Sequence, residues 1–386
     1  MKRILIICYL TFSNVAIAQD SLSFLFMGDF MMHEPQINAA LDSSGTYNFD
    51  HYFKYTYDLI NGTDISVANL EVTLAGPPYK GYPQFSAPDE YALAIKNSGI
   101  DVLTTANNHS NDRGMSGLIR TLDILDSLEI QHLGTYRNSI ERSKNHPLII
   151  EKNNIKVALL NYTYGTNGLI TTFPTQVNRI EENLILGDLE IAKSLGVDKI
   201  IVITHWGKEY KSYPDKYQIY WADFLFNNGV DAIIGGHPHW IQPMEYRMDT
   251  KNGKTSERII AWSLGNIISN QRRLNTDGGC SIQFTLYKDS NGDVKFKNIG
   301  YNLHWVWLNK QVKPKRYHIL PLSDINSLFL DEISMKKYKI FEANSRKLFN
   351  ENNLNIPMTK KCIMSPIHVD SILLMHHINK GFKSLK

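Results

Sequence analysis

The chain has 386 residues, of which 43% are hydrophobic and 20% charged, and its formal net charge is +3. This composition is typical of a soluble globular protein and excludes a chain that is disordered throughout. The nearly neutral charge leaves no basic surface of the kind that binds nucleic acid, so we expect no nucleic-acid partner.

The N-terminus, MKRILIICYLTFSNVAIAQD, has the form of a secretory signal peptide. Two basic residues precede an apolar stretch, and Ala16–Ala18 forms a cleavage motif, which predicts a signal peptide over residues 1–18. The apolar stretch is much shorter than the ~20 residues that span a bilayer, and no later segment is long and apolar enough. We therefore expect an exported protein with no transmembrane helix in the mature chain, located in the periplasm, at the envelope or outside the cell. Whether Cys280 and Cys362 pair is left open.

Short apolar runs alternate with helix-length patterns from Ser21 to about Leu264. The runs predict strands, and their nearly continuous hydrophobicity is typical of strands buried on both faces. They are LSFLFMGD, DISVANLE, IDVLTTANN, IKVALLNY, KIIVITHWG, VDAIIGGH and RIIAWSLGN. Helices are predicted for Gly114–Leu128, Asn183–Leu195 and Tyr217–Asn228. This alternation predicts an α/β protein.

The pattern changes after Asn266. CSIQFTLYKD and VKFKNIGYNLHWVWL flank the turn residues Asn291-Gly292, which predicts a β-hairpin. Two further helices are expected, over Ser323–Leu330 and Asp331–Asn350, and residues 351–386 either include another helix near Ile372–Asn379 or are partly mobile. We therefore divide the mature chain into one domain over residues 21–320 and a C-terminal helical extension over residues 321–386.

Polar side chains stand where the predicted strands end. In α/β sheets, sites form at the carboxyl ends of the strands, so we expect these side chains to lie close together. Carboxylate, amide and imidazole groups form a ligand set for a divalent metal such as Zn, Mn or Fe. The residues concerned are Asp29, Asn69, Glu71, Asn107, Asn108, His109, Asp112, His205, His237 and His239.

The segment GGHPHWIQP, residues 235–243, holds two of these histidines. In an extended segment residues i and i+2 face the same side, and Pro238 favours extended geometry at His237. We therefore expect the rings of His237 and His239 to point to one place. Each polar residue has a structural alternative, as Asp29 could cap a helix and Asn108 could occupy a turn. Their recurrence at successive strand ends favours a shared metal site.

Six segments resemble motifs of the CapA family, which is named for poly-γ-glutamate capsule biosynthesis and is similar to calcineurin-like metallophosphoesterases. In order, between about Phe24 and Asn270, they are GDFMMH, VANLEVTLAG, ANNHSNDRG, THWGKEY, GGHPHWIQPME and WSLGNII. The resemblance implies a four-layer α-β-β-α sandwich of two mixed sheets, with a metal site at one edge.

The resemblance also implies roles for individual residues. Glu71 stands where the related phosphoesterases have a bridging Asp, and His109 resembles their general acid. His205 and His237 match the imidazole ligands of one metal and His239 that of the other. The complete set of implied ligands is Asp29, Glu71, Asn108, His205, His237 and His239.

One motif departs from the phosphoesterase pattern. Those enzymes usually carry D-x-H at the first motif, whereas this chain has Asp29-Phe30-Met31. His33 could supply the missing imidazole if the segment turns back, since residues i and i+4 share a helix face, or it could be a surface residue. The chain would accordingly bind one or two divalent ions.

Three hypotheses follow for the function, and the third of them is a degenerate enzyme fold that is kept for partner binding. In the first, the protein is a metal-dependent hydrolase of a phosphoester or an anionic capsular polymer, with Asn108 holding the ion and His109 protonating the leaving group. Asp112 would orient His109 or stabilise a turn, and the turn is the favoured interpretation. In the second, it is a non-catalytic accessory module that acts with other components of capsular polymer synthesis or export. The candidate substrate contacts are Asn69, Arg113, Lys208 and Asn266, with Arg272 and Arg273 as further cations near the motifs.

Overall fold

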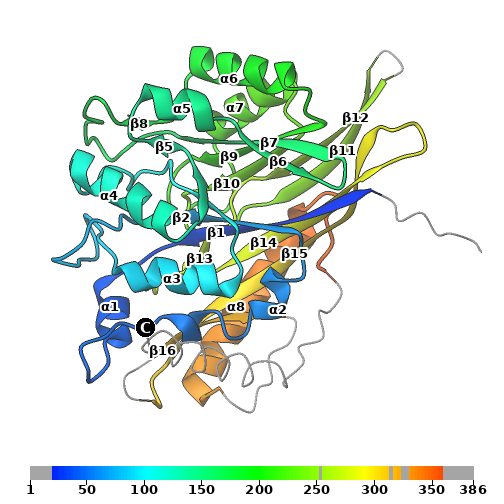
Figure 1. The fold of residues 1–386 in the computed structure, drawn as a ribbon. Helices are drawn as coiled ribbons and strands as arrows, with labels where there is room; N and C mark the ends of the chain where they lie inside the picture. Colours follow the sequence, from blue (N-terminus) through cyan, green and yellow to red (C-terminus); the bar gives the residue numbers. More distant parts are fainter. Residues whose placement is uncertain (1–19, 252–253, 313–315, 323–329, 360–386) are drawn as a thin grey trace, which may run out of the picture.

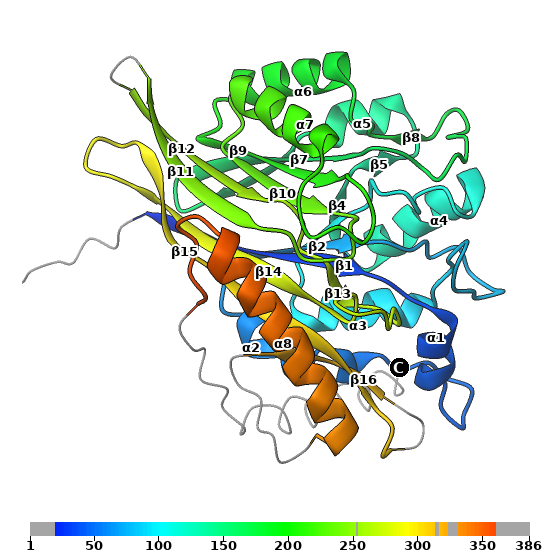
Figure 2. The ribbon, with the colours of Figure 1, turned by 180° about the vertical axis from the view of Figure 1, so that it is seen from behind.

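Two β-sheets packed face to face form the centre of the protein, and helices cover their outer faces (Figures 1 and 2). The computed structural model describes residues 20–251, 254–312, 316–322 and 330–359. From top to bottom in Figure 1 the layers are helices, the smaller sheet, the larger sheet and further helices. The predicted four-layer α-β-β-α arrangement is confirmed.

The larger sheet has eight strands and is mixed. In order across the sheet they are β16 (Arg316–Pro321), β15 (Val294–Asn309), β14 (Gly278–Lys288), β1 (Ser21–Phe30), β2 (Ile65–Leu70), β3 (Val102–Thr104) and β4 (Gln131–Leu133), with β13 (Asn266–Ile268) also paired to β1. Phe24 and Phe26 of β1 belong to the core between the sheets, whereas Leu25 and Met27 pack under the outer helices. Burial on both faces accounts for the continuous apolar run of this strand.

The smaller sheet has six strands. In order they are β11 (Met244–Lys251), β12 (Lys254–Ala261), β10 (Ala232–Gly236), β9 (Lys199–His205), β7 (Ile155–Thr163) and β6 (Leu148–Lys152). The four inner strands run parallel and the two edge strands antiparallel to them, so this sheet is also mixed. A separate two-stranded sheet pairs β5 (Thr135–Tyr136) with β8 (Gln176–Val177).

The chain passes from one sheet to the other between Ala261 and Asn266. The prediction of a single strand over residues 258–266 is therefore wrong, because β12 ends in the smaller sheet and β13 begins in the larger one. Gly265, with a φ of +66°, provides the left-handed backbone that this change of direction needs. As a result, Asn266 lies beside Asp29 of β1.

Helices cover both sheets and shield their apolar side chains from water. The larger sheet carries α1 (Glu34–Ala40), the 3₁₀ turn η1 (Asp50–Tyr52), α2 (Tyr57–Ile60) and α3 (Asp89–Ser98); the smaller one carries α6 (Glu182–Ser194) and α7 (Lys216–Asn227); α4 (Gly114–Ser127) and α5 (Ser139–Asn145) pack near β4 and β5. Three of these helices, α4, α6 and α7, match the predicted ones to within a residue at either end.

The last described helix, α8 (Glu332–Asn352), packs on β15 (Figure 2). The ring centroids of Tyr338 and Trp305 are 6.0 Å apart, and those of Phe349 and Tyr301 are 4.7 Å apart. The predicted helix over residues 331–350 and the hairpin of β14 and β15 are thus confirmed. The division of the chain at residue 320 stays a prediction.

Several sequence predictions fall on the undescribed part of the chain. The signal peptide, the helix near residues 372–379, most of the helix over residues 323–330, and Cys362 all lie outside the described residues. Cys280 is fully buried and forms no disulfide among the described residues. None of the described helices combines the length and the hydrophobicity needed to cross a bilayer.

Candidate metal centre

The candidate centre lies where strands from both sheets end. Pairing places Asp29 of β1 beside Asn69 of β2, and His205 of β9 beside Gly236 of β10. A Cβ atom at Gly236 would lie 2.8 Å from Asp29 Oδ1, so the absence of a side chain lets the end of β10 approach β1. Parallel pairing within each sheet, together with this close contact between sheets, brings distant parts of the sequence into one cluster.

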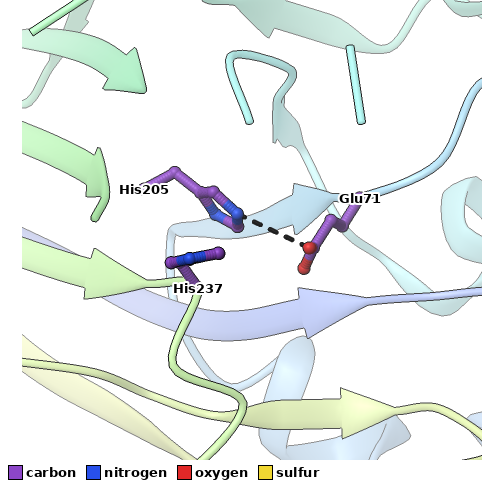
Figure 3. A group of neighbouring side chains, drawn as sticks. All are labelled: Glu71, His205 and His237. Atoms are coloured by element: carbon purple, nitrogen blue, oxygen red, sulfur yellow. Dashed lines mark ion pairs between the residues drawn. The ribbon is translucent and has the colours of Figure 1, made fainter. Parts of the chain in front are cut away.

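One group of candidate ligands consists of Glu71, His205 and His237 (Figure 3). One potential ligand atom from each residue lies within 4.8 Å of those of the other two, and all three side chains are buried. His205 Nε2 is 3.5 Å from Glu71 Oε1 and 2.9 Å from Asn108 Oδ1. Asn108 is therefore placed to add an amide oxygen to this group.

The second group consists of Asp29, Glu71 and His239. His239 Nδ1 is 3.5 Å from Asp29 Oδ2, and His239 Nε2 is 3.9 Å from Glu71 Oε1. Glu71 belongs to both groups, and this is the position that the sequence comparison implied for a bridging carboxylate. Five of the predicted ligands are thus brought together in two adjoining sets.

The chemistry of Glu71 fits a bound cation. Its side chain is fully buried, yet neither carboxylate oxygen has a hydrogen-bond partner among the described residues. Nδ1 of the buried His237 is likewise without a partner there. Buried carboxylates are normally paired or bound to metal, because burying an unpaired charge is costly. The donor set of carboxylates, imidazoles and an amide suits a divalent transition metal.

The HPH segment reaches the site in a way that the sequence did not predict. His237 and His239 have φ values of +95° and +57°, so the expected extended geometry is wrong. The chain turns at Pro238, and the two imidazoles, with ring centroids 6.1 Å apart, face different ligand groups. Tyr210, with a φ of +62°, is held by a hydrogen bond from its N–H to Pro238 O of 2.8 Å. Left-handed backbone at several non-glycine residues is uncommon and is concentrated at functional sites.

The electrostatics of the cluster are unusual for a protein interior. Burial opposes protonation of His239, but the charge of Glu71 and the contact with Asp29 outweigh it and raise its pKa to about 9. Burial would raise the pKa of Asp29, but His239 and His205 hold it below its ordinary value. Burial and the neighbouring imidazoles hold the pKa of His237 well below its ordinary value. The first group thus combines one carboxylate with two imidazoles, and the second combines two carboxylates with one imidazole.

His109, the predicted general acid, is fixed beside the first group. Its Nδ1 is 2.8 Å from Asp112 Oδ2, which also accepts a 2.7 Å hydrogen bond from the Phe85 N–H. The ring of Phe85 lies edge-on to that of His109, with centroids 4.6 Å apart. Asp112 also closes a turn, since its N–H donates to His109 O. Asp112 therefore both orients His109 and stabilises a turn, and its contact with the imidazole ring is the shorter of the two.

Two residues predicted to contact substrate instead hold the carboxylate–imidazole cluster. Asn69 is 7% exposed and donates from Nδ2 to Asp29 Oδ1 at 2.8 Å. Asn266 is fully buried, and its Oδ1 is 3.0 Å from His239 Nδ1. If His239 Nδ1 carries its proton toward Asn266, Nε2 is left as the ligand atom on the side of Glu71.

The remaining predicted residues lie outside the two groups. His33 caps α1, and its Nδ1 accepts a 3.2 Å hydrogen bond from the Asn270 N–H. Burial lowers the pKa of His33 to about 4. Arg113 precedes α4 and donates to Pro78 O at 3.2 Å, and Lys208 is exposed. The structure thus places none of these three side chains in either ligand group.

Two aromatic residues also lie at the site, and the sequence prediction did not include Tyr164. The ring of Tyr164, directly after β7, lies 4.5 Å from that of His237, and the ring of Tyr210 lies 6.2 Å from that of His239. Tyr164 follows the strand IKVALLNYT, so the strand-end rule could have identified it. Tyr210 lies in a loop, and no periodic pattern marks it.

Residues 23–271, more than half of the chain, match the family described as bacterial capsule synthesis protein PGA_cap. The chain belongs to this family. The match begins in β1 and ends just after β13, so it includes every residue of both ligand groups. The helix α8 lies beyond it.

Similar proteins include two from Bacillus. The capsule biosynthesis protein CapA of Bacillus anthracis is 26% identical over 69% of this chain and 64% of its own length. The PGA biosynthesis protein CapA of Bacillus subtilis (strain 168) is 26% identical over 74% of this chain and 73% of its own length. The alignment thus spans slightly less than two thirds of the Bacillus anthracis protein.

Solved structures that overlap with this one include two nucleotidases. Haemophilus influenzae NAD nucleotidase aligns with a TM-score of 0.47 and 13% identity over 94% of this chain and 67% of its own. A putative 5'-nucleotidase from Staphylococcus aureus aligns with a TM-score of 0.45 and 15% identity over 84% of this chain and 58% of its own. At such scores the overlap does not define the fold, which rests on the strand order described above.

Proposed function

We propose that this protein is an exported, metal-dependent hydrolase in capsule biosynthesis, acting on an anionic capsular polymer such as poly-γ-glutamate or on a phosphoester. Membership of the PGA_cap family and the capsule-related names of the Bacillus relatives support the biological role. The signal-peptide pattern of residues 1–18 supports export.

The observation that carries the chemical part of the proposal is the environment of Glu71. Its two buried carboxylate oxygens, which accept no hydrogen bond from the described residues, lie between three imidazoles and Asp29. The ions would be held by two groups that share Glu71, namely Asp29, Glu71 and His239, and Glu71, Asn108, His205 and His237. A divalent ion bound there would supply Lewis acidity, which polarises an ester or amide and makes a neighbouring water reactive near neutral pH.

The chain's own residues supply orientation and proton transfer. Because the Nδ1 edge of His109 faces Asp112, its Nε2 is the nitrogen left to exchange a proton with a leaving group. Phe85 holds the same ring from the side, and its N–H holds Asp112. Asn69 and Asn266 hold Asp29 and His239 in position. A site with these supports would need little rearrangement during turnover.

The second candidate function is a non-catalytic accessory module in capsular polymer synthesis or export that binds the polymer in an ion-dependent way. One observation favours it. Met31, buried at 1% exposure, stands where D-x-H would place an imidazole, and His33 is in neither ligand group. The group around Asp29 accordingly has fewer imidazoles than the group around His205, which would weaken its hold on an ion.

The two functions are separated by substitutions at His109. His109→Gln should leave the bound metal in place but lower turnover of a phosphodiester or of poly-γ-glutamate by about 10²–10⁴-fold, as loss of a general acid does. Metal content by elemental analysis and capsule formation by the producing cells would be measured on the same variant. Undiminished turnover would exclude His109 as the acid. Normal capsule formation by an inactive variant would favour the accessory role.

A further inference from the structure

A cavity of about 180 Å³ lies between α8 and the loops next to the metal centre. Its walls include Tyr213, Trp240, Asn275, Asn344, Lys347 and Glu351. Four of these, Asn275 and the three from α8, lie beyond the segment that matches the family. This α8 cavity is therefore built partly from structure outside the family match.

The α8 cavity adjoins the metal centre through shared chain segments. Trp240 directly follows the candidate ligand His239. Near this cavity, the guanidinium of Arg273 stacks over the ring of Tyr210 at 4.9 Å, and that ring lies 6.2 Å from the imidazole of His239. Arg273 is two residues from Asn275 in the cavity wall. Aromatic and cationic groups thus lead from the candidate ligands to the cavity.

Hydrogen bonds hold the walls of the α8 cavity in place. The fully buried Gln242 donates from Nε2 to Lys211 O and Tyr213 O, at 3.1 and 3.0 Å, and fixes the loop that carries Tyr213. Across the cavity, Asn344 Nδ2 donates to Asn275 Oδ1 at 2.9 Å and ties α8 to the loop after β13. A wall that is already ordered loses little entropy when a ligand binds.

The groups in the walls define the chemistry of a ligand. The indole N–H of Trp240 is buried without a partner among the described residues, and Tyr213 is 54% exposed. Lys347 and the nearby Arg273 offer cations for a carboxylate, while Glu351 and the asparagine amides can accept from N–H groups. A carboxylate-bearing unit joined through amides would satisfy both kinds of group.

The size of the α8 cavity limits how much of such a ligand it holds. Pockets for drug-sized ligands occupy about 300–1,000 Å³, whereas this cavity has about 180 Å³. It therefore fits one small unit and not a whole oligomer. A long polymer would extend out of the cavity, and the wall that contains Trp240 connects the cavity to the metal centre.

We propose that the α8 cavity is a subsite that binds one carboxylate-bearing unit of an amide-linked polymer while another unit of the same chain lies at the metal centre. This inference rests on the proposed function only in taking the substrate to be an anionic polymer. It requires no hydrolysis, since an accessory polymer binder would use the same subsite.

The test compares the binding of short and long poly-γ-glutamate chains at equilibrium. The probes are fluorescently labelled poly-γ-glutamate fractions of about two and about twelve units. The protein is used at full length and with its metal bound. Lys347→Ala should weaken binding of the long chains by about 10-fold, the loss expected for one charge-assisted hydrogen bond. It should change the binding of the two-unit probe much less. Lys339→Ala, an exposed lysine on the same helix, is the matched control and should bind both probes as the wild type does.

Three results would overturn the subsite. These are equal binding of long chains by Lys347→Ala and the wild type, an equal loss for both probes, or no binding of long chains by the wild-type protein. Asn344→Ala provides a second variant, and thermal unfolding shows that both variants fold. If Lys347→Ala also weakened the binding of neutral dextran by the same factor, the assignment of a carboxylate-bearing ligand would be contradicted. Length-dependent binding that requires Lys347, in a protein that does not cleave the chains, would sustain the subsite and refute hydrolysis of poly-γ-glutamate.

Discussion

Glu71→Gln is expected to abolish the stabilisation of the protein by divalent metal. The substitution keeps the shape of the side chain but removes the charge that both ligand groups share. A ligand present at 100 times its Kd stabilises a folded protein by ~2.7 kcal/mol. For a chain of 386 residues, the entropy of unfolding is about 0.8 kcal/mol per kelvin, so the wild-type Tm should rise by ~3–4 °C.

The variant should show a much smaller shift. Loss of a group that orients a ligand already costs 10–100-fold in metal affinity, so loss of the shared carboxylate should cost at least about 100-fold. At the same metal concentration the gain then falls to ~0.4 kcal/mol, or about 0.5 °C. The assay is thermal unfolding of chelator-treated protein with and without MnCl₂.

Glu257→Gln is the matched control for this experiment. Glu257 is 8% exposed, but both of its oxygens have partners, the Tyr246 hydroxyl at 2.7 Å and the Phe296 N–H at 3.2 Å. This variant should unfold at a lower temperature because it disturbs paired groups, and it should keep the full shift with metal. A shift of 3 °C or more in Glu71→Gln would refute the assignment of Glu71 as the shared ligand.

Three further changes test other parts of the structure. Asn266→Ala should weaken metal binding by about 10–100-fold in a calorimetric titration, because His239 loses the contact at Nδ1; unchanged affinity would remove its orienting role. Gly236→Ala should destabilise the protein by about 1–3 kcal/mol in urea unfolding, since the new Cβ would lie 2.8 Å from Asp29 Oδ1. His304 is fully buried, and burial lowers its pKa to about 3. Between about pH 6.5 and 3 the unfolded chain therefore binds a proton at this histidine and the folded chain does not. As the pH is lowered, the free energy of unfolding decreases, by ~2.7 kcal/mol at pH 4.5. In His304→Leu the free energy of unfolding should decrease less as the pH is lowered. The same dependence of stability on pH in the variant and the wild type would contradict the expectation.

Strand periodicity accounted for most of the fold and for the placement of the candidate ligands. Asp29, Glu71 and His205 stand at the ends of apolar runs, and parallel pairing of those runs brings their ends together. This inference needs only local pattern and the rule that sites form at carboxyl ends. It also indicated the alternation of strands and helices, because burial on both faces leaves a continuous apolar signal.

Features that depend on contacts between the sheets could not be predicted. Whether RIIAWSLGN is one strand or two depends on which sheet accepts each half, and no local residue pattern states this. The left-handed backbone at His237 and His239 comes directly after the end of β10, where that strand approaches Asp29, whereas Pro238 by itself favours an extended segment. The roles of amides such as Asn266 likewise depend on tertiary contacts, since an asparagine at a strand end serves equally well as a substrate contact or a support for a ligand.

Crystals of the protein grown with Mn²⁺ or Zn²⁺ would test the central claim most directly, through anomalous diffraction at the absorption edge of the metal. We predict a peak beside Glu71, within coordination distance of its carboxylate and of at least two imidazoles from His205, His237 and His239. A second, weaker peak on the side of Asp29 would indicate a two-ion centre. An anomalous map with no peak at Glu71, or with the metal bound only to surface histidines, would contradict the metal centre and the chemistry that depends on it.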